Sequence, residues 1–319
     1  LRLCSVDATR RPQQIERTVG SDETWQQPAR AVLRDQADRH EPHGIQHAEI
    51  AQHLEPVVAA GAGGELRDRR LARLPGGDVG ATEAGQDEAR VGSVPGDPVG
   101  AGEERVALDG DAVVPVANRL SREGGYDEVI DSQDFHPKGH GSFASQYPGK
   151  KPFVDTVMLN GVEQRLWTDH CEDDTPDSDF HPDLDRSMVK KTVQKGRHPG
   201  VDSYSAFYDN GKDAAAELKA KYPFLGQSTG LAEYIIAQAT AAGADEVAVD
   251  VIGLAFDICA AFTAKHSAKE QYKGKGFATR IIRDGCRPIG DADAAAADLV
   301  ANGVAVIDSS AVLPAAVSK

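Results

Sequence analysis

The first third of this 319-residue chain lacks five amino acids that globular domains use routinely. Residues 1–105 contain no Lys, Asn, Met, Phe or Tyr, although they contain 13 Arg, and Trp25 is their only aromatic residue. A folded core needs large apolar side chains to offset a chain entropy of roughly 1–2 kcal/mol per ordered residue. We therefore expect residues 1–105 to form a low-complexity, poorly packed N-terminal segment.

Two origins of this segment stay open. It is either a natural disordered extension or GC-rich DNA translated outside its coding frame, because Lys, Asn, Phe and Tyr all have A/T-rich codons.

The whole chain also lacks an excess of basic residues, a long apolar run and paired cysteines. A net charge of -15 provides no basic patch for nucleic acid or an anionic membrane. The longest apolar stretch is interrupted by Asp250 and Asp257, well before the roughly 20 residues that span a bilayer. Four irregularly spaced cysteines, none in a C-x-x-C pair, fit a reducing compartment. We expect a cytoplasmic protein with no nucleic-acid or membrane partner; a homo-oligomer stays open.

The sequence becomes that of an ordinary globular domain from Val106 onward, with 14 Lys, 8 Arg and 17 aromatic residues. The apolar pattern predicts a first helix capped by Asp109 or Asp111 and ended by Gly124. Strands and further helices then alternate, with strands expected at 126–131, 189–194, 246–253, 277–283 and 304–307, and helices at 231–242, 257–272 and 291–301. Residues 137–186 favour a long functional loop region. We expect residues 106–319 to form a three-layer α/β domain, a mostly parallel sheet with helices on both faces.

One carboxylate and three imidazoles occur at spacings typical of metal ligands. Asp134 and His136 alternate on an extended segment at a strand end, and His140 returns to the same point through a glycine turn. His170 would arrive from the long loop. Carboxylate oxygen with imidazole nitrogen suits a divalent cation, with Zn favoured and Mn or Fe as alternatives. The competing interpretation is a set of solvated loop histidines beside an N-capping Asp.

Cys259 is the candidate nucleophile. It lies just past the buried strand, in the first turn of the predicted helix, where backbone N–H groups and the helix dipole lower a thiol pKa and stabilise an oxyanion. Lys195, at the end of another strand, would add positive charge near that thiolate. The alternatives are a buried structural cysteine and a solvated lysine.

Five motifs give a resemblance to a known family. They are QDFHPKGHGSF at 133–143, LWTDHC at 166–171, FHPDL at 180–184, KG at 195–196 with DSYSAF at 202–207, and GLAFDIC at 253–259. In order and approximate spacing they resemble nicotinamidases, also called pyrazinamidases, within the isochorismatase-like hydrolases. The resemblance runs from about residue 106 to residue 312.

The resemblance implies an amidohydrolase of NAD salvage and pyridine nucleotide biosynthesis, which converts nicotinamide to nicotinate and ammonia through a cysteine thioester. Cys259 would be the nucleophile and Lys195 the catalytic lysine. The metal ligands would be Asp134, His136, His140 and His170. Trp167 and Tyr204 would line the substrate pocket, and a cis peptide at Leu254-Ala255 would aim an N–H group at the oxyanion.

Two departures from the family leave alternatives open. Phe256 stands where the family usually has Thr. The family's first strand, which supplies the catalytic aspartate, is not found in residues 1–105: Pro95 and Pro98 exclude a central strand from the corresponding stretch, and Asp97 receives no role. The alternatives are another amidase of the same superfamily, or a catalytically dead metal-binding member.

Overall fold

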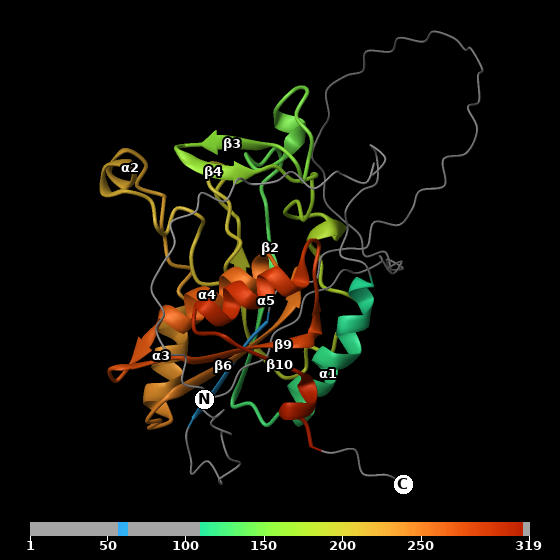
Figure 1. Ribbon diagram of the computed structural model, residues 1–319, viewed down its shortest axis with the longest axis vertical. Coiled ribbons are helices and arrows are strands. Elements are labelled where there is room, and N and C mark those ends of the chain that lie inside the picture. The colour runs from blue at the N-terminus through green and yellow to red at the C-terminus, as the bar shows by residue number, and fades with distance from the viewer. Residues whose placement is uncertain (1–56, 63–108, 315–319) are drawn as a thin grey trace, which may run out of the picture.

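The structure is a computed structural model that describes residues 109–314 together with the backbone of residues 57–62 (Figure 1). The sequence predictions for Trp25, Pro95, Asp97 and Pro98 lie outside these residues, as does most of the expected N-terminal segment. Within the described residues, no helix is long and apolar enough to cross a membrane.

A six-stranded sheet forms the centre of the domain. Its strands lie in the order β10 (Ala305–Ile307), β9 (Ala278–Arg287), β6 (Val247–Leu254), β1 (Val57–Ala62), β2 (Glu128–Asp134) and β5 (Val189–Lys195). The neighbouring pairs β10–β9, β9–β6 and β2–β5 are parallel, whereas β1 is antiparallel to both β6 and β2. The expected mostly parallel sheet is therefore confirmed, with one reversed strand at its centre.

The position of β1 differs from the sequence-based expectation, which placed residues 57–62 in the poorly packed segment. Val57 pairs with Ile252 and Ala62 with Val247, while Ala60 pairs with Glu128 on the other side. Without this strand, the facing edges of β6 and β2 would leave buried backbone N–H and C=O groups unpaired, which is costly. A strand made of Val, Ala and Gly satisfies those backbone groups, and bulky side chains are not required for that. It contains no acidic residue.

Helices cover the sheet much as the apolar pattern predicts. They are α1 (Val113–Glu123), α3 (Leu231–Ala241), α4 (Cys259–Lys269) and α5 (Ala292–Ala301), with a short α2 (Ala216–Lys221) that the sequence did not indicate. The helix α1 packs against β6 and β9, α4 against the same two strands, and α5 against β10 (Figure 1).

The expected helix caps are partly wrong. Asp109 and Asp111 do not cap α1, because its N-cap is Ala112, and Asp109 precedes a separate 3-10 turn without a side-chain hydrogen bond. Gly124 does end α1. Asp291 caps α5, since its carboxylate accepts hydrogen bonds from the backbone N–H groups of Asp293 and Ala294.

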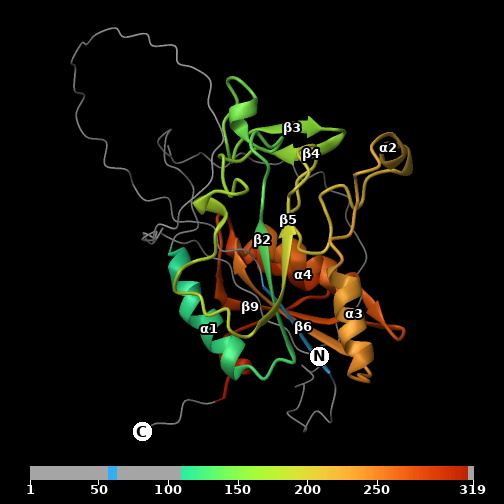
Figure 2. The ribbon, with the colours of Figure 1, turned by 180° about the vertical axis from the view of Figure 1, so that it is seen from behind.

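Two hairpins replace segments that the sequence assigned differently. Strands β3 (Thr156–Leu159) and β4 (Val162–Arg165) form an antiparallel hairpin inside the stretch expected to be loop. It lies beyond the carboxyl ends of β2 and β5 (Figures 1 and 2). The helix expected over 257–272 ends at Lys269, and β7 (Gln271–Tyr272) then pairs with β8 (Lys275–Gly276).

All residues of β2 are buried, although three of them are acidic. Each carboxylate has a cation from β5 or the segment before it: Lys190 Nζ lies 3.1 Å from Glu128, Arg186 Nε 2.6 Å from Asp131, and Lys195 Nζ 2.7 Å from Asp134. A buried carboxylate needs such a partner because desolvation penalises an isolated charge. Of the three carboxylates, Asp134 at the carboxyl end of β2 lines the candidate site.

The apolar core lies between the sheet and its helices. Strands β6 and β9 contribute Val247, Val249, Val251, Ile281 and Ile282, and helices α1, α3 and α4 contribute Leu120, Leu231, Ile235 and Ala264. The strand residues in this list are all β-branched, which suits a pleated surface, whereas three of the four helix residues are Leu or Ala. This core fixes the carboxyl ends of β2, β5 and β6 against one another.

Candidate active site

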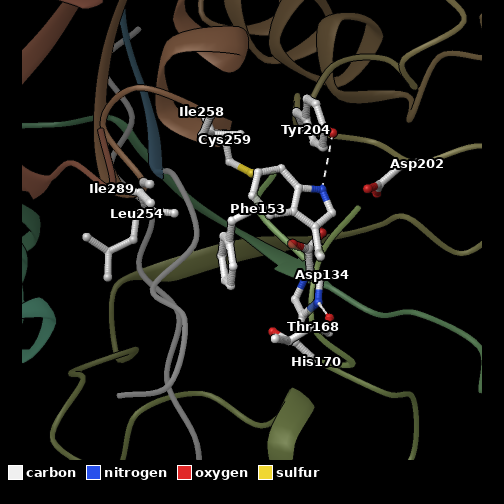
Figure 3. Close-up of a pocket in the computed structure, with 12 residues that line it drawn as sticks. Asp134, Phe153, Thr168, His170, Asp202, Tyr204, Leu254, Ile258, Cys259 and Ile289 are labelled. Carbon is white, nitrogen blue, oxygen red and sulfur yellow. Dashed lines mark hydrogen bonds between the residues drawn. The ribbon is translucent and has the colours of Figure 1, made fainter. Parts of the chain in front are cut away.

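A cavity opens at the carboxyl ends of β2, β5 and β6, the edge at which parallel sheets bind ligands (Figure 3). It has a volume of about 570 Å³, including its open mouth. The residues that line it are Asp134, Phe153, Trp167, Thr168, His170, Asp202, Tyr204, Leu254, Ala255, Ile258, Cys259 and Ile289. The predicted nucleophile and two of the predicted metal ligands, Asp134 and His170, therefore share one cavity, whereas His136 and His140 are buried and do not line it.

Cys259 is the first residue of α4 and is partly exposed to the cavity. The turn before it is held by backbone hydrogen bonds, in which Ala255 O accepts from Ile258 N and Ala260 N at 3.1 Å each. The peptide bond between Leu254 and Ala255 is cis. The thiol thus lies at a helix start beside the end of β6, as the sequence pattern predicts.

Asp134, His136 and His170 form a compact group whose candidate ligand atoms all lie within 4.8 Å of one another. His136 is 1% exposed, and its Nδ1 lies 2.9 Å from Gly196 O. His170 Nδ1 lies 2.8 Å from Thr168 O. These backbone oxygens orient the two rings, which is the usual arrangement around metal-binding histidines. The group has the donor set of a site for Zn or a similar cation.

His140 lies beside this group but has different partners. Its ring centroid is 4.5 Å from that of His136. Its Nδ1 lies 2.8 Å from Ser142 Oγ and its Nε2 3.0 Å from His198 O. A second possible group joins His140 to His136 and the buried Asp202. The four predicted ligands are therefore brought together, with His136 common to both candidate groups.

Lys195 is 1% exposed and does not line the cavity. Its ammonium group donates to Asp134 Oδ1 at 2.7 Å and to Ser203 O at 3.1 Å. Lys195 therefore contacts Asp134 on the side away from the cavity and acts on the cavity only through its pairing with that carboxylate.

Trp167 and Tyr204 form an aromatic wall of the cavity. The indole Nε1 donates to the Tyr204 hydroxyl at 3.1 Å, and the two rings meet edge to face at 5.8 Å (Figure 3). Gln164 Nε2 also donates to this hydroxyl, at 2.8 Å. Burial, followed by the negative charge of Asp202, raises the pKa of Tyr204, so the phenol remains neutral. A flat heteroaromatic ring fits against such a surface.

Sequence reasoning gave no role to Asp202, Phe153, Ile258 and Ile289, which also line the cavity. Asp202 had a detectable signal, since it follows β5 within the motif that contains Tyr204. Phe153, Ile258 and Ile289 are apolar residues in connecting segments, where no periodicity marks them.

The cavity lies at the carboxyl ends of the parallel strands, where α/β hydrolases keep their catalytic groups. The fold and the position of the cavity are therefore those of an α/β hydrolase. No family model matches the chain. The nicotinamidase of Acinetobacter baylyi is 34% identical over 206 residues, which cover 64% of this chain and 84% of that protein. The nicotinamidase of Escherichia coli is 37% identical over 183 residues, covering 57% of this chain and 74% of that protein.

Among solved structures, a nicotinamidase/pyrazinamidase of Acinetobacter baumanii superimposes with a TM-score of 0.54 at 34% identity, covering 65% of this chain and 89% of that one. The yeast nicotinamidase, at 23% identity and a TM-score of 0.51, shares the fold. The chain therefore belongs to the nicotinamidase family and is an amide hydrolase, as the five motifs indicated.

Proposed function

We propose that Cys259 performs the hydrolysis of nicotinamide to nicotinate and ammonia. The thiolate attacks the amide carbon, the C–N bond breaks as the nitrogen takes up a proton, and ammonia leaves a thioester. Water then attacks the thioester carbon, and the sulfur leaves as the acid forms. The observation that carries this proposal is the cavity that Cys259 shares with the aromatic wall and with Asp134 and His170 of the Asp/His group.

The other residues have supporting roles in this proposal. The backbone N–H groups of Ala255 and Cys259 stabilise the oxyanion, and Trp167 and Tyr204 hold the pyridine ring. A divalent cation would be held by Asp134, His136 and His170, with His140 beside them. Zn is the preferred cation, and Mn and Fe are the alternatives. Such a cation would bind the pyridine nitrogen directly or through water. Lys195 pairs with Asp134 at 2.7 Å and would add positive charge to the site.

The deciding assay is ammonia release from nicotinamide by the purified chain. Cys259→Ala should lose at least a thousandfold in kcat, because Cys259 is the only thiol among the described residues that line the cavity. Cys286→Ala is the matched control: that thiol is 3% exposed, burial raises its pKa to about 12, and it does not line the cavity. We expect the control to keep kcat within about twofold. Equal loss in both variants would exclude Cys259 as the nucleophile.

A specific observation keeps a weakly active or inactive family member as the second candidate. No acidic residue occurs in 57–62, and the carboxylates lining the described cavity are Asp134 and Asp202. Asp134 pairs with Lys195, and Asp202 accepts hydrogen bonds from Ser203 N and Gln164 Nε2. Without the family's general acid/base, we expect kcat about 10²–10⁴-fold below that of the Escherichia coli relative assayed alongside. Equal kcat would mean that another group supplies the proton transfer.

The cytoplasmic compartment and the homo-oligomer expected from the sequence also remain proposals. Cys171, Cys259 and Cys286 form no disulfide within the described residues, which fits a reducing compartment.

A further inference from the structure

Asp257 connects the turn that carries the nucleophile to a loop from another strand. It lies two residues before Cys259, and both of its carboxylate oxygens accept backbone hydrogen bonds from the loop after β9. Ile289 N donates to Oδ1 at 2.9 Å and Gly290 N to Oδ2 at 2.7 Å. A carboxylate that accepts two backbone N–H groups holds a loop more firmly than a neutral acceptor would.

The connection continues the sheet past its last paired residues. The β6–β9 register ends with Leu254 opposite Arg287, and Phe256 N donates to Arg287 O at 2.8 Å. The side chain of Asp257 then extends this attachment by two further bonds. At Gly290, an added Cβ would lie 2.9 Å from Asp257 Oδ2, closer than real Cβ atoms approach, so the tight contact depends on glycine there.

The held loop forms one wall of the cavity. Ile289 lines the cavity together with Leu254 and Ile258, on the side opposite the Asp134 and His170 group (Figure 3). Asp257 does not line this cavity. Asp257 lines a smaller adjoining cavity, to which Phe153, Trp167, Ile258 and Ile289 also belong. Ile289 is the cavity residue whose backbone Asp257 holds, so its position is the route by which Asp257 would act on a bound ring.

We propose that Asp257 is a positioning residue that determines which amides fit, by holding Ile289 against the substrate ring. This inference rests on the proposed hydrolysis of nicotinamide. Loss of the carboxylate releases the 287–290 loop and widens the cavity on that side. The start of α4 keeps its own bonds, from Ile258 N and Ala260 N to Ala255 O, so the thiol stays in place.

Steady-state kinetics with nicotinamide and 5-methylnicotinamide test the proposal. In Asp257→Ala we expect KM for nicotinamide to rise about tenfold, as for two lost charge-assisted hydrogen bonds acting indirectly, while kcat changes less than threefold. The preference for nicotinamide over its methylated analogue should fall at least fivefold. Asp257→Asn keeps one acceptor oxygen, so its KM and its selectivity should lie between those of the parent and those of Asp257→Ala. Equal loss of kcat/KM for both amides, with KM unchanged, would overturn the proposal, because a purely structural role produces that result.

Gly290→Ala provides an independent variant. It should reproduce the selectivity change, and in the Asp257→Ala background it should add little, because both substitutions break the same contact. Full additivity would contradict the proposal.

Amide hydrogen exchange measures the contact without turnover. Asp257→Ala should speed exchange at Ile289 and Gly290 by at least tenfold and leave Ala264, within α4, unchanged. Unchanged exchange at Ile289 and Gly290 would overturn the proposal even if nicotinamide is hydrolysed. If exchange is faster in Asp257→Ala but the parent does not hydrolyse nicotinamide, the role of Asp257 in holding the loop is supported and the proposed function is rejected.

Discussion

His136 and His140 are neighbours in space, yet their ring nitrogens have different partners. The Nδ1 of His136 pairs with a backbone oxygen, and its Nε2 lies 3.8 Å from Asp134 Oδ1. Both nitrogens of His140 lie within hydrogen-bonding distance of protein oxygens. We therefore expect His136→Ala and His170→Ala to weaken Zn binding at least a hundredfold, and His140→Ala less than tenfold. Metal content after dialysis against a graded chelator series measures this.

His181→Ala is the control for that experiment. His181 pairs with Asp111 at 3.5 Å and belongs to neither candidate metal group in the described part of the chain. Its variant should bind Zn as the parent does. If His140→Ala loses as much Zn as His136→Ala, the four-ligand set expected from the sequence is correct.

Gly196 affects the same imidazole through the backbone. It has φ +64°, and a Cβ there would lie 2.3 Å from His136 Cε1. Gly196→Ala should therefore displace the ring and lower Zn affinity at least tenfold. Gly196→Ala would act through backbone strain and through the contact with the ring. Gly243→Ala separates these two causes, because Gly243 has φ +65° but no atom within 4 Å of an added Cβ. Calorimetry should show a stability loss of about 1 kcal/mol in Gly243→Ala with Zn affinity unchanged. Equal Zn affinity in both variants would show that the ring tolerates the contact.

Helix α4 contains a titratable group away from the cavity. His266 is 8% exposed, its Nδ1 has no hydrogen-bond partner among the described residues, and its ring meets Tyr208 edge to face at 5.6 Å. Burial, followed by the charges of Lys269, Lys212 and Lys265 and opposed by Asp213, lowers the pKa of His266 to about 4. The folded protein therefore binds this proton less readily than the unfolded chain, whose histidine titrates near 6.5.

The consequence is a loss of stability at acidic pH. Below pH 6.5 the unfolded chain takes up the proton first, so stability declines as pH falls from about 6.5 toward 4. Between pH 7 and 5 this residue should cost about 2 kcal/mol. His266→Phe, which keeps an aromatic ring against Tyr208, should reduce the pH dependence of the unfolding free energy by that amount in urea titrations. An unchanged slope would show that folding does not shift the pKa of His266.

Local patterns were sufficient for some elements and for part of the site. The apolar pattern located α1, α3, α5, β5 and β6 to within a few residues. In α1 and α3 the buried residues recur at helical spacing, and β6 is a nearly continuous buried run. The polar residues of the cavity appeared as motifs at strand ends, since catalytic side chains there need particular residue types. The hairpin β3–β4 was missed because its strands alternate weakly and are mostly exposed.

Contacts set by tertiary structure could not be predicted in this way. Ile289 reaches the cavity only because Asp257 holds its loop, and neither residue has a sequence pattern that links them. The same limit applies to β1. Six residues of Val, Ala and Gly have no alternating polarity, and their place between β6 and β2 depends on two strands that follow much later in the chain.

The integrity of the whole sheet depends on that central strand, and one substitution tests it. Ala59 pairs with Val129 on one side and Asp250 on the other, so Ala59→Pro removes a backbone donor inside a strand with two neighbours. We expect a loss of about 3 kcal/mol or more in the free energy of unfolding, measured by urea titration. Ala215→Pro is the control, because Ala215 is exposed just before α2 and its φ of −58° suits a proline ring. If Ala59→Pro and Ala215→Pro both unfold at the same urea concentration as the parent, residues 57–62 do not complete the sheet in solution.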